Sequence, residues 1–253
     1  MKRPIQALLL VLSGLGLLHV SLFTDLCLRY VKEGMRPMLV ASGAVLLILG
    51  VAEAWAQRRP GRSDEHAPHR DHADDGSSHG HDHSAVPRVA WLMLLPALSL
   101  LFYAPPALGA YTAARQAPKA VPERAHFDPL PKASPLPMTL TDFTTRVQQD
   151  RKQAIKGRSI LMTGFVTPEK QAGSWYLTRI ILTCCAADAQ SIKVRIYGRP
   201  ALSPNTWVSV TGTWHRGGTL GTKSAPVALD ARTVKKITRP SNGYTDNLPF
   251  PAP

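Results

Sequence analysis

The sequence predicts a membrane protein with three N-terminal transmembrane helices and a C-terminal, mainly-β domain, an OB-like small barrel preceded by one helix. Two observations support this prediction. Three stretches with almost no charge lie in the first 112 residues, and each approaches the roughly 20 apolar residues that cross a bilayer core. Beyond residue 138, apolar and polar residues alternate in five short runs, as in strands with one buried face.

The membrane domain is expected to cover residues 1–112. The first and third apolar stretches carry no charged side chain, and the second carries only Glu53. The three expected spans are residues 5–23, 37–56 and 89–111. A secretory signal peptide is the alternative for the first stretch, because Lys2 and Arg3 precede it. No small-x-small cleavage triplet follows the apolar run, so an uncleaved transmembrane helix is favoured.

The distribution of lysine and arginine predicts how the spans are oriented. The N-terminus and the second loop together hold seven of these residues, whereas the first loop holds three. Short loops rich in lysine and arginine remain in the cytoplasm. We therefore expect a multi-pass protein of a bacterial cell membrane, with a cytoplasmic N-terminus and an extracytoplasmic C-terminal domain.

The second loop, residues 58–88, is rich in histidine and acidic residues. It holds six of the nine histidines of the chain and too few apolar residues to form a core, so it is expected to be disordered. Neutral imidazoles on a flexible chain gather around divalent transition metals, and the run formed by His79, His81 and His83 is the best candidate. A solvated loop that binds metal only incidentally is the alternative.

The C-terminal half is expected to begin with a proline-rich linker, residues 113–137, that behaves as an extended spacer. A domain of residues 138–240 follows, and a tail of residues 241–253 closes the chain. The domain should open with a short helix, because Thr141 and Asp142 accompany a helical spacing of apolar residues. Its five expected strands are separated by glycine and proline turns: residues 159–167, 175–182, 192–197, 206–214 and 227–238.

Two adjacent cysteines are the most unusual feature of this domain. Cys184 and Cys185 follow an apolar strand and precede Asp188. In one interpretation these three residues, with His215 or His126, bind zinc or another divalent transition metal, since thiolate and imidazole suit such ions. In others, the thiols alternate with a disulfide, or the small side chains only allow close strand packing. Adjacent residues of a strand point to opposite faces, so a joint metal site requires a turn here.

The positive charge of the chain is concentrated in its C-terminal part. Residues 113–253 hold 20 of the 30 basic and 8 of the 17 acidic residues, an excess of 12 positive charges. Such a surface attracts anionic lipids or wall polymers, and the expected extracytoplasmic location argues against a nucleic-acid partner. The sequence has no nucleophile elbow, no phosphate-binding P-loop and no H-E-x-x-H motif, so no enzyme activity is predicted.

Several runs of the C-terminal domain resemble a known family. They are T-C-C-A-A-D-A, the strand W-Y-L-T-R-I-I-L before it, N-T-W-V-S-V-T-G-T-W after it and the basic V-K-K-I-T-R-P. With the N-terminal spans and the histidine-bearing loop, they resemble the bacterial TIGR03943 family of membrane proteins, whose soluble part is the DUF1980 domain of unknown function. Five residues match the signature of that family: Cys184, Cys185, Ala186, Asp188 and Ala189.

The resemblance implies a small subunit of a two-component permease complex, beside a larger multi-spanning subunit of the DUF318 type. We therefore expect an accessory permease subunit, with metal ions as the expected cargo and the two cysteines and Asp188 in the external domain. A membrane-anchored thiol or metal-dependent enzyme is the first alternative. An envelope-organising protein whose basic domain binds anionic surfaces is the second.

Overall fold

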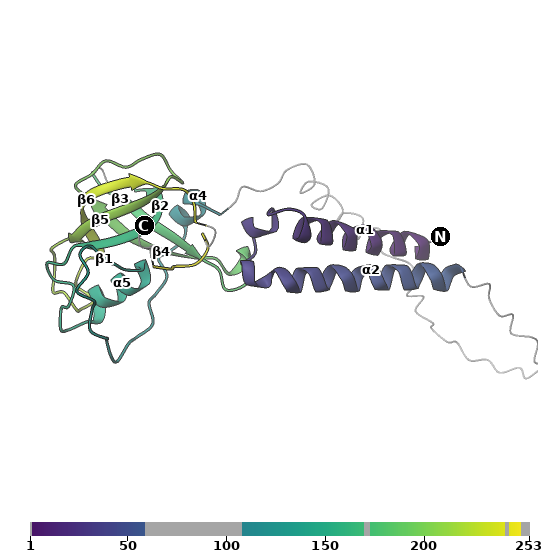
Figure 1. The fold of residues 1–253 in the computed structure, drawn as a ribbon, viewed down its shortest axis with the longest axis horizontal. Helices are drawn as coiled ribbons and strands as arrows, with labels where there is room; N and C mark the ends of the chain where they lie inside the picture. The colour runs from purple at the N-terminus through teal and green to yellow at the C-terminus, as the bar shows by residue number, and fades with distance from the viewer. Residues whose placement is uncertain (1, 59–107, 170–172, 241–242, 249–253) are drawn as a thin grey trace, which may run out of the picture. The chain divides into compact units, whose positions relative to one another are not determined.

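Figure 1 shows the computed structural model, which describes residues 2–58, 108–169, 173–240 and 243–248. Contacts within the chain divide it into two compact units. One unit contains residues 1–14 and 45–107, and the other contains residues 15–44 and 108–253. The segment that joins the first two helices therefore belongs to the same unit as the C-terminal domain.

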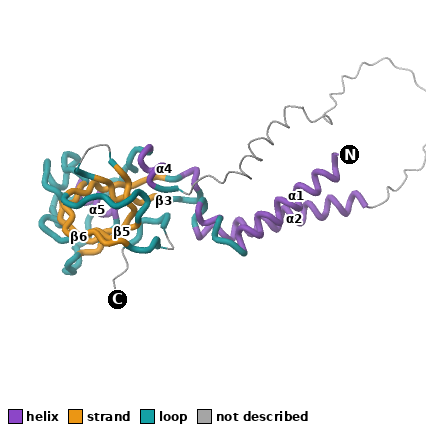
Figure 2. The backbone as a smooth tube through the Cα atoms, turned by 90° about the horizontal axis from the view of Figure 1, so that it is seen from above, coloured by secondary structure: helices purple, strands orange, loops and turns teal. Residues whose placement is uncertain are grey.

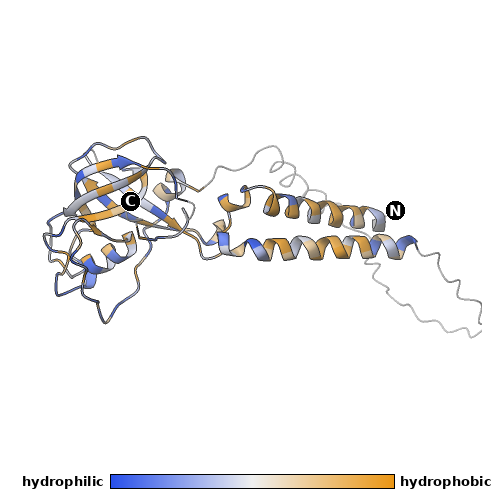
Figure 3. Cartoon of the chain, viewed as in Figure 1, coloured by the Kyte–Doolittle hydropathy of each residue, from blue (hydrophilic) through white to orange (hydrophobic). Residues whose placement is uncertain are grey.

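Two long helices, α1 (Lys2–Leu22) and α2 (Arg36–Arg58), cover the first two expected spans. Each contains a stretch with a mean hydropathy of 2.0, long and apolar enough to cross a membrane. Their apolar residues appear orange in Figure 3, and many of the larger ones are exposed, such as Leu8 at 57% and Ile48 at 66%. Water is a poor solvent for such surfaces, so the two helices indicate association with a membrane.

The third expected span lies mostly outside the described residues and stays a prediction, as does the histidine-rich loop. The described chain resumes at Leu108, and a short helix α4 (Ala110–Arg115) follows. Ala110 and Ala113 are buried in a small apolar cluster on β2 and β3. The last residues of that expected span thus pack on the C-terminal domain.

The C-terminal domain contains one six-stranded sheet. Its strands are β1 (Leu136–Pro137), β2 (Ile160–Pro168), β3 (Trp175–Ile181), β4 (Gln190–Tyr197), β5 (Trp207–Trp214) and β6 (Ala228–Lys236). Their order is β1-β2-β3-β4-β6-β5, and β2 also pairs with β5, so the sheet closes on itself. The pairing of β4 with β6 is parallel, and the other pairings among β2 to β6 are antiparallel. Figure 2 shows the strands gathered in one group.

The mainly-β prediction for this domain is confirmed. Each of the five expected strands is present, with ends within two residues of the expected ones. The alternation of buried and partly exposed residues is clear in β5, whose second, fourth and sixth residues are buried. The two-residue strand β1, parallel to the start of β2, was too short to produce such a pattern.

One hydrophobic core fills the closed sheet, and helix α5 (Leu140–Gln149) contributes to it. Leu140, Phe143 and Val147 are spaced at three and four residues, so they share one helix face and are fully buried. The helix begins at Leu140, one residue before Thr141, where it was expected to open. The Thr139 hydroxyl caps it by accepting the Asp142 N–H at 3.0 Å.

The described part of the tail also belongs to the domain. Tyr244 is buried against β2 and β3, where its carbonyl accepts the N–H of Leu182 at 3.1 Å. The carboxylate of Asp246 accepts the backbone N–H of Leu140 at 3.1 Å and that of Thr141 at 2.6 Å. These N–H groups lie in the first turn of α5 and have no partner within the helix, so Asp246 stabilises its N-terminus.

Arg179 in β3 is a buried charge, with 2% of its surface exposed. Its guanidinium donates to the carbonyl of Thr163 at 2.9 Å, to the Thr163 hydroxyl at 2.6 Å and to the carbonyl of Thr245 at 3.0 Å. It also lies 4.8 Å from the centre of the Trp207 ring. Burial lowers the pKa of Arg179. This side chain connects β3, β2 and the C-terminal segment.

Candidate functional site

The two cysteines lie in a hairpin loop between β3 and β4. The strand pairing ends where Ile181 faces Gln190, so the residues between them leave the sheet. A short 3-10 helix, η4 (Ala186–Asp188), occupies the second half of this loop. Cys184 and Cys185 therefore do not alternate across a strand, and the turn that a joint site requires is present.

The loop brings two sulfur atoms and a carboxylate together. The Sγ atoms of Cys184 and Cys185 are 3.6 Å apart, and one ligand atom from each of Cys184, Cys185 and Asp188 lies within 4.8 Å of the others. Two thiolates bound at about 2.3 Å to a tetrahedral zinc ion lie about 3.8 Å apart. The sulfur separation is thus close to that of a shared zinc ion, and much longer than the roughly 2.05 Å of a disulfide.

Asp188 holds the loop in this conformation. Its carboxylate accepts the backbone N–H groups of Thr183 at 2.8 Å, Cys184 at 2.7 Å and Cys185 at 3.4 Å. In return, the Cys185 sulfur accepts the backbone N–H of Asp188, which completes a reciprocal cap on η4. These bonds all lie within six residues, so local contacts alone bring the sulfur and oxygen atoms together.

The same contacts set the protonation of the group. The hydrogen bond with Asp188 and, next, that with Cys185 raise the pKa of the Cys184 thiol to about 11. Hydrogen bonds from Cys184 and from the loop backbone lower the pKa of Asp188 to about 2. At neutral pH, Asp188 is ionised and Cys184 keeps its proton. A soft cation would take the place of that proton, since metals bind the thiolate.

The segment between α1 and α2 packs against the cysteine loop. The N–H of Ala186 donates to the carbonyl of Tyr30 at 2.6 Å, and the N–H of Lys32 donates to the carbonyl of Cys184 at 3.0 Å. Val31 and Cys185 form an antiparallel bridge between these two bonds. Residues 30–32 thus extend the hairpin loop by a short strand-like contact, which no local sequence pattern could indicate.

Tyr244 also stabilises the contact between residues 30–32 and the cysteine loop. Its hydroxyl donates to the carbonyl of Arg29 at 2.8 Å, while its backbone carbonyl holds Leu182 at the end of β3. The third cysteine, Cys27, is buried in the same interhelical segment. It does not belong to the group formed by Cys184, Cys185 and Asp188.

Other residues of the predicted site lie elsewhere. The Nδ1 atom of His215 is 2.6 Å from a carboxylate oxygen of Asp230, and its ring stacks on Tyr197 with centroids 4.3 Å apart. His126 is exposed and faces Asp128. Neither histidine joins the cysteine group within the described residues. His79, His81 and His83 fall outside those residues, so their assignment stays a prediction.

The exposure of the two cysteines argues against the interpretation in which their small side chains only allow close strand packing. Both Cys184 and Cys185 are partly exposed, whereas the apolar residue before the loop, Leu182, is buried. The two thiols therefore do not fill the space between strands as core residues would. A solvent-borne ion or reagent can reach them.

Comparison with known proteins identifies the C-terminal part of the chain. Residues 138–245 match the DUF1980 C-terminal domain. The match begins just before α5, contains β2 to β6 and the cysteine loop, and ends one residue after Tyr244. No curated protein and no solved structure shows significant similarity to the chain.

Proposed function

Given a DUF1980 C-terminal domain at residues 138–245, we propose that the protein is a membrane-anchored accessory subunit of a permease complex. We further propose that the cysteine loop binds zinc or another divalent transition metal through Cys184, Cys185 and Asp188. The observation that carries the metal proposal is the 3.6 Å separation of the two sulfur atoms, with a carboxylate in the same small group.

The ligand set suits an exchangeable ion. A tetrahedral ion bound by two thiolates and one carboxylate oxygen keeps one position for water or for a ligand from another molecule. Asp188 already accepts three backbone N–H groups, and two carboxylate oxygens offer about four lone-pair sites. The fourth site faces the Cys184 thiol, so it becomes available to a metal when the metal replaces the thiol proton. Closed structural zinc sites have four protein ligands, and an incomplete set favours transfer of the ion to a partner.

The membrane part supports an accessory role. The resemblance to the TIGR03943 family implies a larger, multi-spanning DUF318-type permease subunit as the partner. The two described helices carry few polar side chains, among them His19 and Glu53, and offer no charged pathway of their own. In this proposal the third span at residues 89–111 places the C-terminal domain outside the cytoplasm, where a nucleic-acid partner is not expected.

The strand order supports an OB-like barrel for the domain. Five strands, β2 to β6, close through the β2–β5 pairing, and the third and fifth of them are parallel neighbours. This is the arrangement of a small five-stranded Greek-key barrel. The cysteine loop joins the second and third strands of this barrel.

Zinc binding by the purified full chain in lipid nanodiscs tests the metal proposal. Equilibrium dialysis should show one site that is lost in the Cys184→Ser, Cys185→Ser double variant. The matched control, His79→Asn, His81→Asn, His83→Asn, removes the candidate ligands of the histidine-rich loop. Loss of all zinc in the histidine variant, with full binding in the cysteine variant, would contradict the proposal.

Gentle isolation of the tagged chain from native membranes, followed by mass spectrometry, tests the accessory role. Recovery of a multi-spanning permease with the wild type is the expected result. If the chain is isolated intact and no such protein accompanies it, the subunit proposal is wrong.

Other observations distinguish this proposal from the two alternatives, a thiol-dependent enzyme and an envelope-organising protein. A thiol-dependent enzyme needs a general base beside the nucleophile, and His215, its best candidate, does not belong to the group formed by Cys184, Cys185 and Asp188 among the described residues. An envelope-organising protein should bind anionic vesicles with an affinity that falls steeply with salt concentration. A subunit held by apolar helix faces should keep its partner at high salt.

A further inference from the structure

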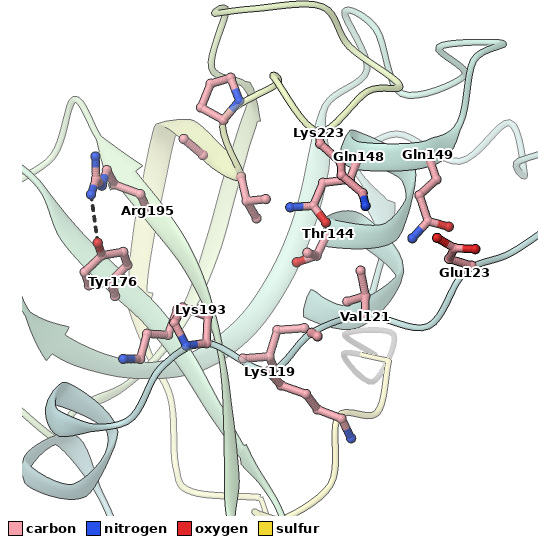
Figure 4. A pocket seen from close by; sticks show the side chains of 16 residues that line it. Lys119, Val121, Glu123, Thr144, Gln148, Gln149, Tyr176, Lys193, Arg195 and Lys223 are labelled. Carbon is pink, nitrogen blue, oxygen red and sulfur yellow. Dashed lines mark hydrogen bonds between the residues drawn. The ribbon is translucent and has the colours of Figure 1, made fainter.

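A pocket of about 670 Å³ lies on the C-terminal domain, apart from the cysteine loop. Strands β3 and β4 form one wall, helix α5 forms another, and residues 118–123 run along the opening. In Figure 4, Tyr176 and Arg195 lie on the sheet side, and Thr144 and Gln148 face them from the helix. None of the residues that line this pocket belongs to the cysteine group.

The segment along the opening is fixed at both ends. Near its start, Pro118 forms a parallel bridge with Ser191 of β4, and the N–H of Lys119 donates to the Ser191 carbonyl at 2.7 Å. Near its end, the Gln149 amide of α5 donates to the Pro122 carbonyl at 3.2 Å and accepts the N–H of Arg124 at 2.8 Å. Backbone bonds at one end and the Gln149 side chain at the other therefore hold this segment beside the pocket.

The charges around the pocket are predominantly positive. Lys119, Lys193, Arg195 and Lys223 line it, with Glu123 as the one acidic lining residue. Arg195 is neutralised by Glu169, which lies 2.6 Å away. Among the described residues, no carboxylate lies within ion-pair distance of the three lysines.

The three lysine side chains differ in their exposure and in the contacts that they already make. The Lys193 ammonium uses one donor on the Gln116 carbonyl at 2.7 Å and keeps the others. Burial lowers the pKa of Lys193, a cost that a bound anion would offset. Lys119 is partly exposed and Lys223 is exposed, so both can turn toward a ligand.

The pocket is not lined by charge alone. Val121 and Val227, both partly exposed, supply aliphatic surface between the lysines. The Gln148 amide on α5 offers both donors and an acceptor to a ligand. Ligand pockets combine such an apolar lining with a few polar groups that fix orientation.

We propose that this pocket binds a small anionic molecule whose phosphate group is held by Lys119, Lys193 and Lys223 and whose apolar body packs on Val121 and Val227. A lysine ammonium is a point charge on a flexible side chain, so it can bind a phosphate without a fixed geometry. Binding here would give the domain a second ligand, independent of any metal at the cysteine loop.

Calorimetric titration of the full chain in nanodiscs of uncharged lipid tests this proposal, with phenyl phosphate as the probe. Inorganic phosphate and phenol, each alone, separate the contribution of the charge from that of the apolar body. The test variant is Lys119→Gln, Lys223→Gln. The matched control is Lys235→Gln, Lys236→Gln, which removes the same charge from exposed positions on β6 outside the pocket.

Phenyl phosphate should bind with an affinity that falls about tenfold in the test variant and stays within about twofold in the control. Inorganic phosphate should bind more weakly than phenyl phosphate, and phenol should not bind measurably. Equal losses in both variants would show attraction by net charge only and would overturn the proposal. Equal affinities for phenyl phosphate and inorganic phosphate would overturn the apolar part of it, and absence of binding would overturn it entirely.

Discussion

The carboxylate of Asp188 accepts the backbone N–H of Cys184 at 2.7 Å and, through a hydrogen bond with the thiol of the same residue, raises the pKa of that thiol to about 11. One side chain thus shapes the loop and keeps its first cysteine protonated. In the proposed metal site, the cation would replace this proton, because metals bind the thiolate.

Replacing Asp188 by Asn should make Cys184 more reactive toward iodoacetamide in the chelator-treated chain. The thiolate is the reactive form, and removing the carboxylate charge lowers the pKa of Cys184 toward its usual range. A decrease of one unit raises the thiolate fraction about tenfold at pH 8. Alkylation rates followed by fragment-ion mass spectrometry between pH 7 and 10 measure this change.

The control for this experiment is Asp230→Asn, which removes a carboxylate that faces His215 and lies outside the cysteine group. Its alkylation profile should match that of the wild type. Equal rates for Asp188→Asn and the wild type across the whole pH range would contradict the account of Cys184.

Removing the Tyr244 hydroxyl should loosen the contact between the interhelical segment and the cysteine loop. Tyr244→Phe keeps the buried ring and loses only the bond to the Arg29 carbonyl. A lost hydrogen bond of this kind costs about 1 kcal/mol. Hydrogen exchange at the amides of Ala186 and Lys32 should become about fivefold faster.

Tyr111→Phe serves as the matched control, since Tyr111 is 69% exposed. Its exchange pattern should not change. If Tyr244→Phe also leaves both amides unchanged, the contact of residues 30–32 with the loop does not depend on Tyr244.

The sequence predicted the strands of the domain because burial on one face imposes a two-residue period. It also predicted that Cys184, Cys185 and Asp188 act together, although only their proximity in the chain supported that. The role of Asp188 as the acceptor of three backbone N–H groups was not predicted, since it depends on the conformation of the loop. The contact with Val31 joins residues about 150 positions apart and leaves no local signal.

Two charged residues show why part of the fold could not be predicted. Arg179 shares a strand face with Trp175 and Leu177, and nothing in the sequence names the three acceptors on which the structure buries it. Asp246 lies in an apparently irregular tail, but it caps a helix that begins about 100 residues earlier. In both cases most of the partners are backbone groups, which every sequence has.

Replacing Arg179 by Leu should destabilise the C-terminal domain strongly. The carbonyls of Thr163 and Thr245 would lose a charged donor, which costs about 3 kcal/mol in the free energy of unfolding. Urea unfolding of the full chain, followed by tryptophan fluorescence, measures this change. Arg232→Leu, at an exposed position of β6, should change the midpoint little. Similar midpoints for the two variants would contradict the role of Arg179.

Replacing Asp246 by Ala should destabilise helix α5. Its N-terminal N–H groups at Leu140 and Thr141 would lose their acceptor, and caps of this kind contribute about 1 to 2 kcal/mol. The same unfolding experiment applies, with Asp128→Ala as the control because its side chain is 93% exposed. An unchanged midpoint for Asp246→Ala would mean that water replaces the cap without cost.

X-ray absorption at the zinc edge shows directly whether Cys184 and Cys185 bind the metal. The sample is the full chain loaded with one equivalent of zinc, measured for the wild type and for the His79→Asn, His81→Asn, His83→Asn variant. Two sulfur ligands at about 2.3 Å and oxygen or nitrogen ligands at about 2.0 to 2.2 Å are expected in both samples. A wild-type shell of nitrogen and oxygen alone would contradict this expectation and would place the bound metal away from Cys184 and Cys185.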